Sequence, residues 1–334
     1  MFYFSGFPQS RGVAAGGDSM ERFPLPPFPN GWFKVCYSEE LPAAGVRPVH
    51  VVGRDLVVFR GEDGAARILD AYCPHLGAHL GVGGKVVENT IRCPFHGWRW
   101  NGDGSCAEVP YAKRIPPKAE VGCWRVLEQN GFIASWFHAE KAEPAFTPDL
   151  IPEVGHPDYS LFGRRKWEIN AHLQDLYENG FDVAHFKTLH GMEVKGVNLT
   201  PEGPIMKLHL EFVRDAAAQS SAEGMATIRS FMYGPGLSLT RVSGLIEGVS
   251  VQSLTPIDPG KMELTHNYYL HKQSNREVAE GFFDFYAKDW ELDIPLWNTK
   301  VFRPQPVLAE GDGDISRFRK WYRQFYSEPV EVNF

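Results

Sequence analysis

The chain has 334 residues, of which 43% are hydrophobic, 13% aromatic and 22% charged. This length suggests two domains of roughly 100 to 200 residues each, and the apolar content excludes a largely disordered chain. The formal net charge is −7 and no basic stripe is present, which argues against nucleic acid or an anionic membrane as a partner.

Cellular location is constrained by three features of the sequence. No apolar run approaches the roughly 20 residues that a membrane-spanning helix needs. Residues 1–20 contain no charged segment followed by an apolar one, so we expect no secretory signal. Five scattered cysteines are too few for a disulfide framework in a chain this long. We therefore expect a cytoplasmic protein whose cysteines serve a metal or redox centre.

The first half of the chain has the pattern of a small antiparallel β domain. After an N-terminal tail at residues 1–30, short β-branched runs recur over residues 31–140, and the turns Glu62-Asp63-Gly64 and Gln129-Asn130-Gly131 favour hairpins. Residues 141–160 hold four prolines among acidic residues, which is typical of an interdomain connection.

Residues 161–334 predict a second domain that mixes helices and strands. A helix is predicted over Trp167 to His190, ending at Gly191, and alternating residues between Ile205 and Leu270 predict a second antiparallel sheet. Residues 276–300 and 314–326 predict two further helices. The predicted fold class is α+β.

Two Cys–His pairs form the strongest chemical signal in the sequence. They are C-P-H at Cys73 and His75 and, after 17 intervening residues, C-P-F-H at Cys93 and His96. Zinc is one alternative because it takes the same ligand types. Zinc motifs usually pair like with like, however, whereas each half here supplies one thiolate and one imidazole, which is the ligand set of a Rieske [2Fe–2S] cluster.

The segments CPHLGAHLGVGG and CPFHGWRW resemble the cluster loops of Rieske oxygenases. Respiratory Rieske proteins differ, because they carry a disulfide where this chain has Ala78 and Phe95 and a serine where it has Trp98. The resemblance implies an N-terminal Rieske domain at residues 31–140. It also implies a catalytic domain at 161–334, in which an antiparallel sheet is flanked by helices in a helix-grip-like fold.

A second candidate metal site lies in the run E-N-G-F-D-V-A-H-F-K-T-L-H at residues 178–190. His185 and His190 are five residues apart and so do not share one face of a helix, which must bulge or end between them if both bind one metal. Alone, this spacing is a weak signal. The run is similar to the Rieske oxygenase pattern N-x-x-D-x-x-H-x4-H, matched by Asn179, Asp182, His185 and His190.

The resemblance implies that His185 and His190 bind one Fe(II) together with a distant carboxylate. Composition alone leaves six candidates open: Asp284, Asp289, Glu291, Asp293, Asp312 and Asp314. The segments ELDIPLWNTK, PQPVLAEGDG and FRKWYRQFY resemble the ketosteroid hydroxylase and cholesterol desaturase branch, which implies Asp293, in a D-x-x-x-W pattern with Trp297, and leaves Asp289 second. Asp182 would bridge His185 to a Rieske histidine of an adjacent subunit, which implies a homotrimer.

The implied protein is a terminal oxygenase that uses O2 and electrons from NAD(P)H, delivered by a flavin and iron–sulfur reductase or a ferredoxin. It would hydroxylate a hydrophobic polycyclic substrate, with a steroid favoured by the branch resemblance. A hydrophobic pocket is expected around Phe181, Phe186, Leu189, Trp297 and Phe302.

Three alternatives stay open. The chain could be a steroid desaturase, or a hydroxylase or demethylase that acts on an aromatic or other small substrate. An aromatic acid would want a buried arginine, for which Arg241 and Arg303 are candidates. A non-catalytic electron carrier is opposed by the second metal motif and by the length of chain beyond the Rieske domain.

Overall fold

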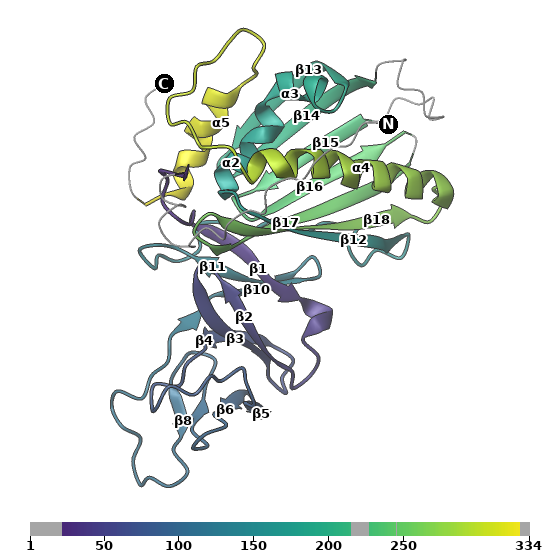
Figure 1. Ribbon diagram of the computed structural model, residues 1–334. Coiled ribbons are helices and arrows are strands. Elements are labelled where there is room, and N and C mark those ends of the chain that lie inside the picture. The colour runs from purple at the N-terminus through teal and green to yellow at the C-terminus, as the bar shows by residue number, and fades with distance from the viewer. Residues whose placement is uncertain (1–21, 215–226, 245, 328–334) are drawn as a thin grey trace, which may run out of the picture.

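The computed structural model describes residues 22–214, 227–244 and 246–327, which form four antiparallel sheets with the longest helix lying across the largest sheet (Figure 1). This arrangement confirms the predicted α+β class. Most of the tail predicted at residues 1–30 lies outside the described residues. Within the described ranges, no helix has the length and apolar character to cross a membrane.

Three small sheets make up the N-terminal part of the molecule. Their strand orders are β1-β11-β10, β2-β3-β4-β9 and β5-β6-β7-β8. The strands are β1 (Gly31–Tyr37), β2 (Val46–Val51), β3 (Arg54–Arg60), β4 (Ala66–Asp70), β5 (Lys85–Val87), β6 (Thr90–Arg92), β7 (Arg99–Trp100), β8 (Cys106–Glu108), β9 (Cys123–Trp124), β10 (Val126–Gln129) and β11 (Phe132–Phe137), with a 3₁₀ turn η1 (Ser38–Glu40) after β1.

Both hairpins predicted from turn residues are present. Strands β3 and β4 pair on either side of residues 62–64, and β10 pairs with β11 across Asn130 and Gly131. Asn130 has φ +53° and Gly131 has φ +77°, the left-handed backbone that a two-residue type I′ turn requires. Local turn chemistry therefore sets the register of this part.

A seven-stranded sheet forms the C-terminal part, in the order β12-β18-β17-β16-β15-β14-β13. Its strands are β12 (Tyr159–Ile169), β13 (Met192–Glu202), β14 (Ile205–Arg214), β15 (Thr227–Tyr233), β16 (Leu237–Ser243), β17 (Gly248–Asp258) and β18 (Lys261–His271). The single helix predicted over Trp167 to His190 is wrong in two respects. Residues 167–172 are not helical, since Trp167 lies in β12 opposite Leu264 of β18, and the rest is divided into short helical segments with an extended residue, Asp182, between them. Hydrogen-bonded pairing of β12 with β18 outweighs the local preference of this segment for helix.

The helices occupy one face of this sheet. They are α2 (Leu173–Glu178), η2 (Asn179–Phe181), α3 (Val183–Thr188), α4 (Arg276–Trp297), α5 (Ile315–Tyr322) and η3 (Arg323–Phe325). The two helices predicted at residues 276–300 and 314–326 are confirmed by α4 and by α5 with η3. Figure 1 shows α4 running across strands β15 to β18.

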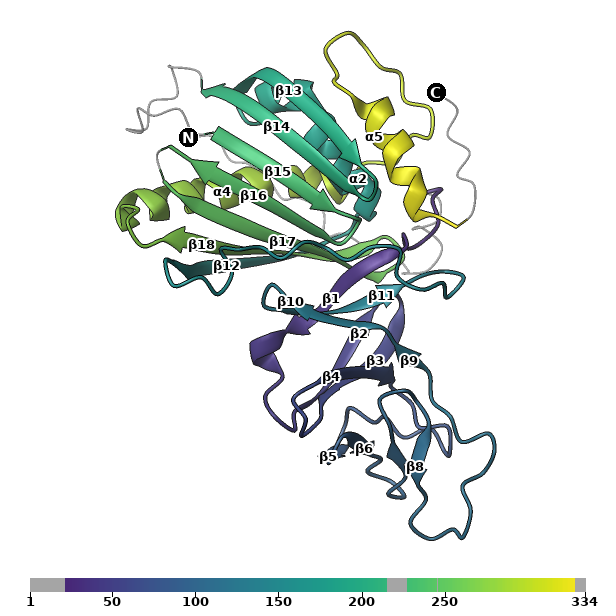
Figure 2. The ribbon, with the colours of Figure 1, turned by 180° about the vertical axis from the view of Figure 1, so that it is seen from behind.

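The opposite face of the seven-stranded sheet packs on the N-terminal part (Figure 2). Leu239 and Val251 of this face join Phe132 and Ile151 in one apolar cluster. Strands β16 and β17 are therefore covered on both sides. The two cysteine–histidine loops lie at the far end of the molecule from α3 and α4 (Figure 1).

Candidate metal centres and pocket

The two cysteine–histidine loops have the same backbone conformation. In each loop the cysteine N–H donates to the carbonyl oxygen five residues later, at 2.9 Å from Cys73 and 2.8 Å from Cys93. The N–H groups of Gly77 and Gly97 donate back to these cysteine carbonyls, at 2.9 and 3.2 Å. Both glycines have φ near +75°, which a residue with a side chain adopts only with strain. The repeated C-P-x-x-G pattern thus builds two matching ligand-bearing turns.

The four predicted ligands are brought together at the ends of these turns. The rings of His75 and His96 lie 4.6 Å apart, and Cys73 and Cys93 are both buried beneath them. Burial raises the pKa of the Cys73 thiol to about 11, and the nearby Cys93 thiol adds to the rise. Two buried thiols become thiolates readily only beside positive charge. Two thiols and two imidazoles in this setting fit a Rieske [2Fe–2S] cluster.

An aromatic ring stacks on His75, and apolar side chains are exposed at the tip of the two cysteine–histidine loops. The Trp98 indole stacks on His75 with 4.7 Å between ring centroids and donates a 2.8 Å hydrogen bond to the Tyr111 hydroxyl. Leu76 and Phe95, beside the two histidines, are exposed. The histidine edge of the centre therefore lies close to the protein surface.

His185, His190 and Asp293 form the second candidate centre. One ligand atom from each lies within 4.8 Å of the other two. Helix α3 carries His185 and ends at Thr188, so His190 follows the end of the helix, as the five-residue spacing predicts. Asp293 comes from the buried side of α4. Two imidazoles and one carboxylate converging in this way suit Fe(II).

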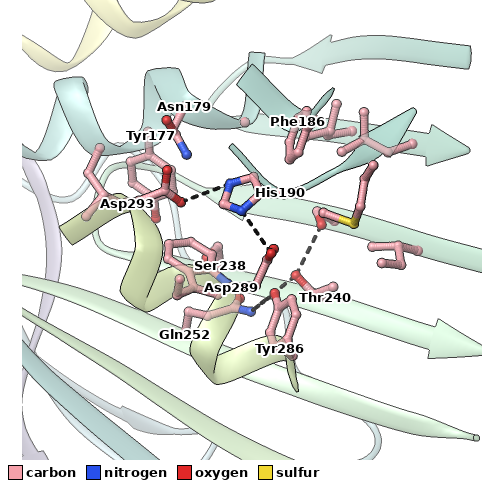
Figure 3. A pocket seen from close by; sticks show the side chains of 18 of the residues that line it. Tyr177, Asn179, Phe186, His190, Ser238, Thr240, Gln252, Tyr286, Asp289 and Asp293 are labelled. Carbon is pink, nitrogen blue, oxygen red and sulfur yellow. Dashed lines mark hydrogen bonds and ion pairs between the residues drawn. The ribbon is translucent and has the colours of Figure 1, made fainter. Parts of the chain in front are cut away.

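Each of the two imidazoles has a separate partner at each ring nitrogen. Nδ1 of His185 contacts the backbone carbonyl oxygen of Asp182, while Nε2 lies 3.1 Å from Nδ2 of Asn179. Nδ1 of His190 lies 2.8 Å from Oδ1 of Asp289, and Nε2 lies 3.4 Å from Oδ2 of Asp293 (Figure 3). Outer partners at Nδ1 fix the tautomer that leaves a lone pair on Nε2 for a metal.

The two aspartates create a place for positive charge at His190. Burial acts to lower the pKa of this imidazole, but hydrogen bonds to Asp289 and Asp293 outweigh burial and raise the pKa to about 9. A divalent cation at Nε2 would pair with Asp293, while Asp289 would accept the Nδ1–H of the neutral imidazole. Asp289, the second choice for third ligand, lies behind His190 instead of beside the shared centre.

Asp182 is placed at the surface, at the start of α3. Its Oδ1 accepts a hydrogen bond from the His185 backbone N–H at 3.3 Å and so caps the helix. The same oxygen lies 3.9 Å from His185 Nδ1, and the side chain is 38% exposed. The Val183 N–H donates to the Asp312 carbonyl at 3.2 Å, so the loop before α5 braces this turn.

A deep cavity lies between the helices and the seven-stranded sheet and contains the triad end of α3 and α4. The empty space in it, counted out to its open mouth, is about 1000 Å³. Apolar side chains dominate its walls: Leu176, Phe186, Met192, Leu208, Leu210, Ile228, Met232, Leu254, Phe282, Phe285 and Trp290. A pocket with these predominantly apolar walls suits a hydrophobic small molecule.

Of the five predicted pocket residues, only Phe186 lines this cavity. Phe181 is fully buried and stacks on Phe318 at 4.4 Å, Trp297 is enclosed beside Trp290, and Phe302 packs under a guanidinium. Leu189, which follows α3, is also outside the lining. Sequence proximity to the ligands does not distinguish a pocket wall from the core behind it.

The remaining charged candidates are engaged elsewhere. Asp284 pairs with Arg165 at 2.8 Å, and Glu291 accepts a hydrogen bond from Trp167 at 3.2 Å. Arg241 lies on the other face of β16 and pairs with Glu153 at 2.6 Å. No lysine or arginine, Arg303 included, is among the described residues that line the cavity.

A set of uncharged polar residues in the same cavity was not predicted from the sequence. Ser230, Ser238, Thr240 and Gln252 from the sheet and Tyr286 from α4 all line it. Alternating serine, threonine and glutamine in a strand usually indicates a solvent-facing side, which is why the pattern gave no signal.

Comparisons with known proteins match both halves of the chain. Residues 31–124 match the Rieske [2Fe-2S] domain, and residues 135–326 match the 3-ketosteroid 9alpha-hydroxylase C-terminal domain. A cholesterol 7-desaturase from Ciona intestinalis is 37% identical, over 91% of this chain and 70% of its own length. The oxygenase component of a 3-ketosteroid-9-alpha-monooxygenase from Rhodococcus rhodochrous is 29% identical, over 91% of this chain and 85% of its own.

Solved structures share the fold at low sequence identity. NdmA of Pseudomonas putida with caffeine superposes with a TM-score of 0.72 at 20% identity, covering 92% of this chain and 91% of its own. Apo dicamba monooxygenase gives a TM-score of 0.68 at 17% identity, covering 89% of this chain and 96% of its own.

Proposed function

This chain belongs to the Rieske oxygenases that carry the 3-ketosteroid 9α-hydroxylase C-terminal domain, and on that basis we propose that it is the terminal oxygenase of a system that oxidises a steroid. Membership makes it an oxygen-using oxidoreductase that works with a reductase or ferredoxin. The substrate and the outcome of the reaction are the proposed part.

The observation that carries the proposal is the deep apolar cavity beside the triad. Its walls are predominantly apolar, and the cavity reaches from His190 and Asp293 along α4 and the sheet, which suits a hydrophobic skeleton. The described lining contains no lysine or arginine but does contain Asp289 and Asp293, which disfavours a carboxylic acid. A neutral, hydrophobic substrate therefore fits better than an aromatic acid.

Each site residue has a proposed task. His185, His190 and Asp293 would hold Fe(II), while Cys73, His75, Cys93 and His96 would hold the cluster. Bound there, the two groups would supply O2 activation and one-electron transfer. The Asp182 carbonyl and Asp289 orient the two imidazoles, and Asn179 lies against His185 at the cavity edge. The apolar walls keep water from the reacting carbon.

We also propose a homotrimer in which Asp182 links His185 to a cluster histidine of the neighbouring subunit. The support is spatial, because the two centres lie at opposite ends of one chain and Asp182 is partly exposed (Figure 1). Electrons would come from NAD(P)H through a flavin and iron–sulfur reductase or a ferredoxin. The five cysteines are all free, which supports a reducing, cytoplasmic location.

Desaturation is the second candidate outcome. Seven cholesterol 7-desaturases match with 31–37% identity, above the 29% of the ketosteroid monooxygenase. Hydroxylation and desaturation both begin at one C–H bond, so the same residues serve either outcome.

The deciding experiment supplies the iron-loaded protein with a surrogate reductase, NADH, O2 and a panel of sterols, ketosteroids and aromatic acids. Products are identified by mass. A steroid that gains one oxygen atom indicates hydroxylation, and one that loses two hydrogens indicates desaturation. Release of formaldehyde from a methylated substrate, or conversion of an aromatic acid alone, would contradict the steroid proposal.

A further inference from the structure

The sheet beneath the cavity carries a strip of uncharged polar side chains on three neighbouring strands. Ser230, Ser238, Thr240 and Gln252 line the cavity, and Ser250 lies beside them. Cross-strand pairing places Ser230 beside Thr240 and Thr240 beside Ser250, and it places Ser238 beside Gln252. Because side chains two residues apart in a strand share a face, all five point to the side that α4 covers. We call these five residues the polar strip.

The polar strip is buried where apolar side chains would be expected. Gln252 and Ser250 are each 1% exposed and Thr240 is 5% exposed. On the other face of the same strands, Leu239 and Val251 are apolar. Burying amide and hydroxyl groups costs free energy unless hydrogen bonds offset it, so the arrangement is not explained by packing alone.

Hydrogen bonds within the polar strip leave spare capacity. Ser238 Oγ donates to Gln252 Oε1 at 3.0 Å. Gln252 Nε2 lies 3.0 Å from Ser250 Oγ, 3.2 Å from Thr240 Oγ1 and 3.4 Å from the Tyr286 hydroxyl. Gln252 has two N–H hydrogens for these three oxygens, and Thr240 Oγ1 also lies 3.1 Å from Ser230 Oγ, so at least one of the three oxygens keeps an acceptor site for a ligand. Hydroxyl groups rotate and can either donate or accept.

We propose that the polar strip, with Tyr286, binds a neutral oxygen of the substrate, as a hydroxyl or a carbonyl, and thereby fixes which carbon faces His185, His190 and Asp293. This inference rests on the proposed function and adds the anchor to it. Figure 3 shows Thr240, Gln252 and Tyr286 grouped below His190, on the sheet side of the cavity. Hydroxyl and amide groups can each donate and accept hydrogen bonds, so the polar strip suits both an alcohol and a ketone.

The test measures binding of three steroids that differ only in one oxygen function: androstane, androstanol and androstanone. Dissociation constants for the iron-loaded protein, without reductase, are read from the fluorescence of tryptophan, since Trp290 lines the cavity. Thr240→Val removes one hydroxyl at nearly constant volume, and Gln252→Met removes the amide. Ser253→Ala is the matched control, because Ser253 is equally buried and hydrogen-bonded but points to the opposite face of β17.

We expect each strip variant to weaken binding of the alcohol and the ketone about 5- to 30-fold, as loss of a buried hydrogen bond does, with androstane changed less than about twofold. Ser253→Ala should leave all three constants unchanged. Equal weakening for all three ligands, or none for the oxygenated pair, would overturn the inference and leave the steroid proposal standing. If no steroid binds the unmodified protein, the proposed function fails and the anchor with it. Should Gln252→Met not fold, Thr240→Val decides alone.

Discussion

At the scale of single residues, the environment of His190 makes Asp289 the most informative side chain. Its carboxylate lies 2.8 Å from Nδ1, on the far side of the ring from Asp293. We predict that Asp289→Asn weakens iron binding about 10- to 100-fold, because an outer carboxylate orients the ligand and increases its basicity. Iron content after dialysis against a graded chelator measures this. Asp284→Asn, on the same helix but paired with Arg165, should retain iron fully.

Asp182 combines a structural role with a proposed functional one, and two substitutions separate them. Asparagine caps a helix as well as aspartate does, whereas alanine costs about 1 kcal/mol. We therefore expect Asp182→Asn to unfold like the unmodified protein and Asp182→Ala to be less stable. If the Asp182 carboxylate links subunits, both variants should keep their iron and their turnover should fall at least about tenfold. Full turnover in Asp182→Asn would remove that role.

Residue chemistry was predictable where the ligand type is rare. The pairs C-P-H and C-P-F-H, followed by glycine, are specific enough that the four residues could be named before any fold was known. Asp293 could not be chosen over Asp289 by composition, because both lie on one helix face and only contact geometry separates them. Thr240 and Gln252 escaped notice because burial, not residue type, makes them unusual.

At the scale of elements, the loop that ends at α5 depends on one glycine. A Cβ at Gly313 would lie 2.2 Å from the Phe181 carbonyl oxygen, in a residue with φ +91°. We predict that Gly313→Ala destabilises the fold by about 2–3 kcal/mol. Gly311 has φ +101° with nothing within 4 Å, so Gly311→Ala should cost about 1 kcal/mol. Similar thermal midpoints for the two variants would contradict this reading.

Elements with a strong local pattern were predictable, and those defined by pairing were not. Helix α4 shows its amphipathic period and an Asn275 cap in the sequence, and the Asn130–Gly131 turn fixes its hairpin. Strand β12 is an edge strand of the large sheet and carries several basic residues. The sequence near Trp167 predicts a helix. This segment is a strand because β18 lies beside it, and no local sequence window contains that partner.

At the scale of the whole molecule, buried neutral histidines set a pH dependence of stability. Burial lowers the pKa of His266 to about 3 and that of His172 to about 4. The unfolded chain, with pKa near 6.5, binds more protons across this window, so the free energy of unfolding falls as pH falls below about 6.5. Each histidine contributes up to roughly 1.4 kcal/mol per pH unit.

Urea unfolding between pH 5 and 6.5 measures this slope. His266→Phe, which keeps an aromatic ring among Trp167, Tyr286 and Trp290, should flatten it by about one histidine's share. Because Asp175 and Glu178 are buried with raised pKa values and act in the opposite sense, the difference between variant and unmodified protein is the quantity to compare. An unchanged slope would rule out His266 as a contributor.

The separation of the two centres gives a prediction for the assembly. If neighbouring subunits pair a cluster with an iron site, two inactive variants should complement each other. We expect coexpressed Cys93→Ser and His190→Ala chains to recover a measurable fraction of turnover, although each alone is inactive. No recovery in mixed assemblies would contradict the homotrimer with exchanged centres.

Strands β16 and β17 also decide how a substrate reaches the cavity. Both faces of these strands are covered and both edges are hydrogen-bonded, so their amides should exchange with solvent deuterium only on global unfolding. A floor that opens so rarely cannot admit a ligand during turnover. The way in must pass through the helical side, where α3 is only six residues long and α4 contains Pro295. Ligand binding should therefore change amide hydrogen exchange in α3 and α4, while exchange in β16 and β17 stays the same.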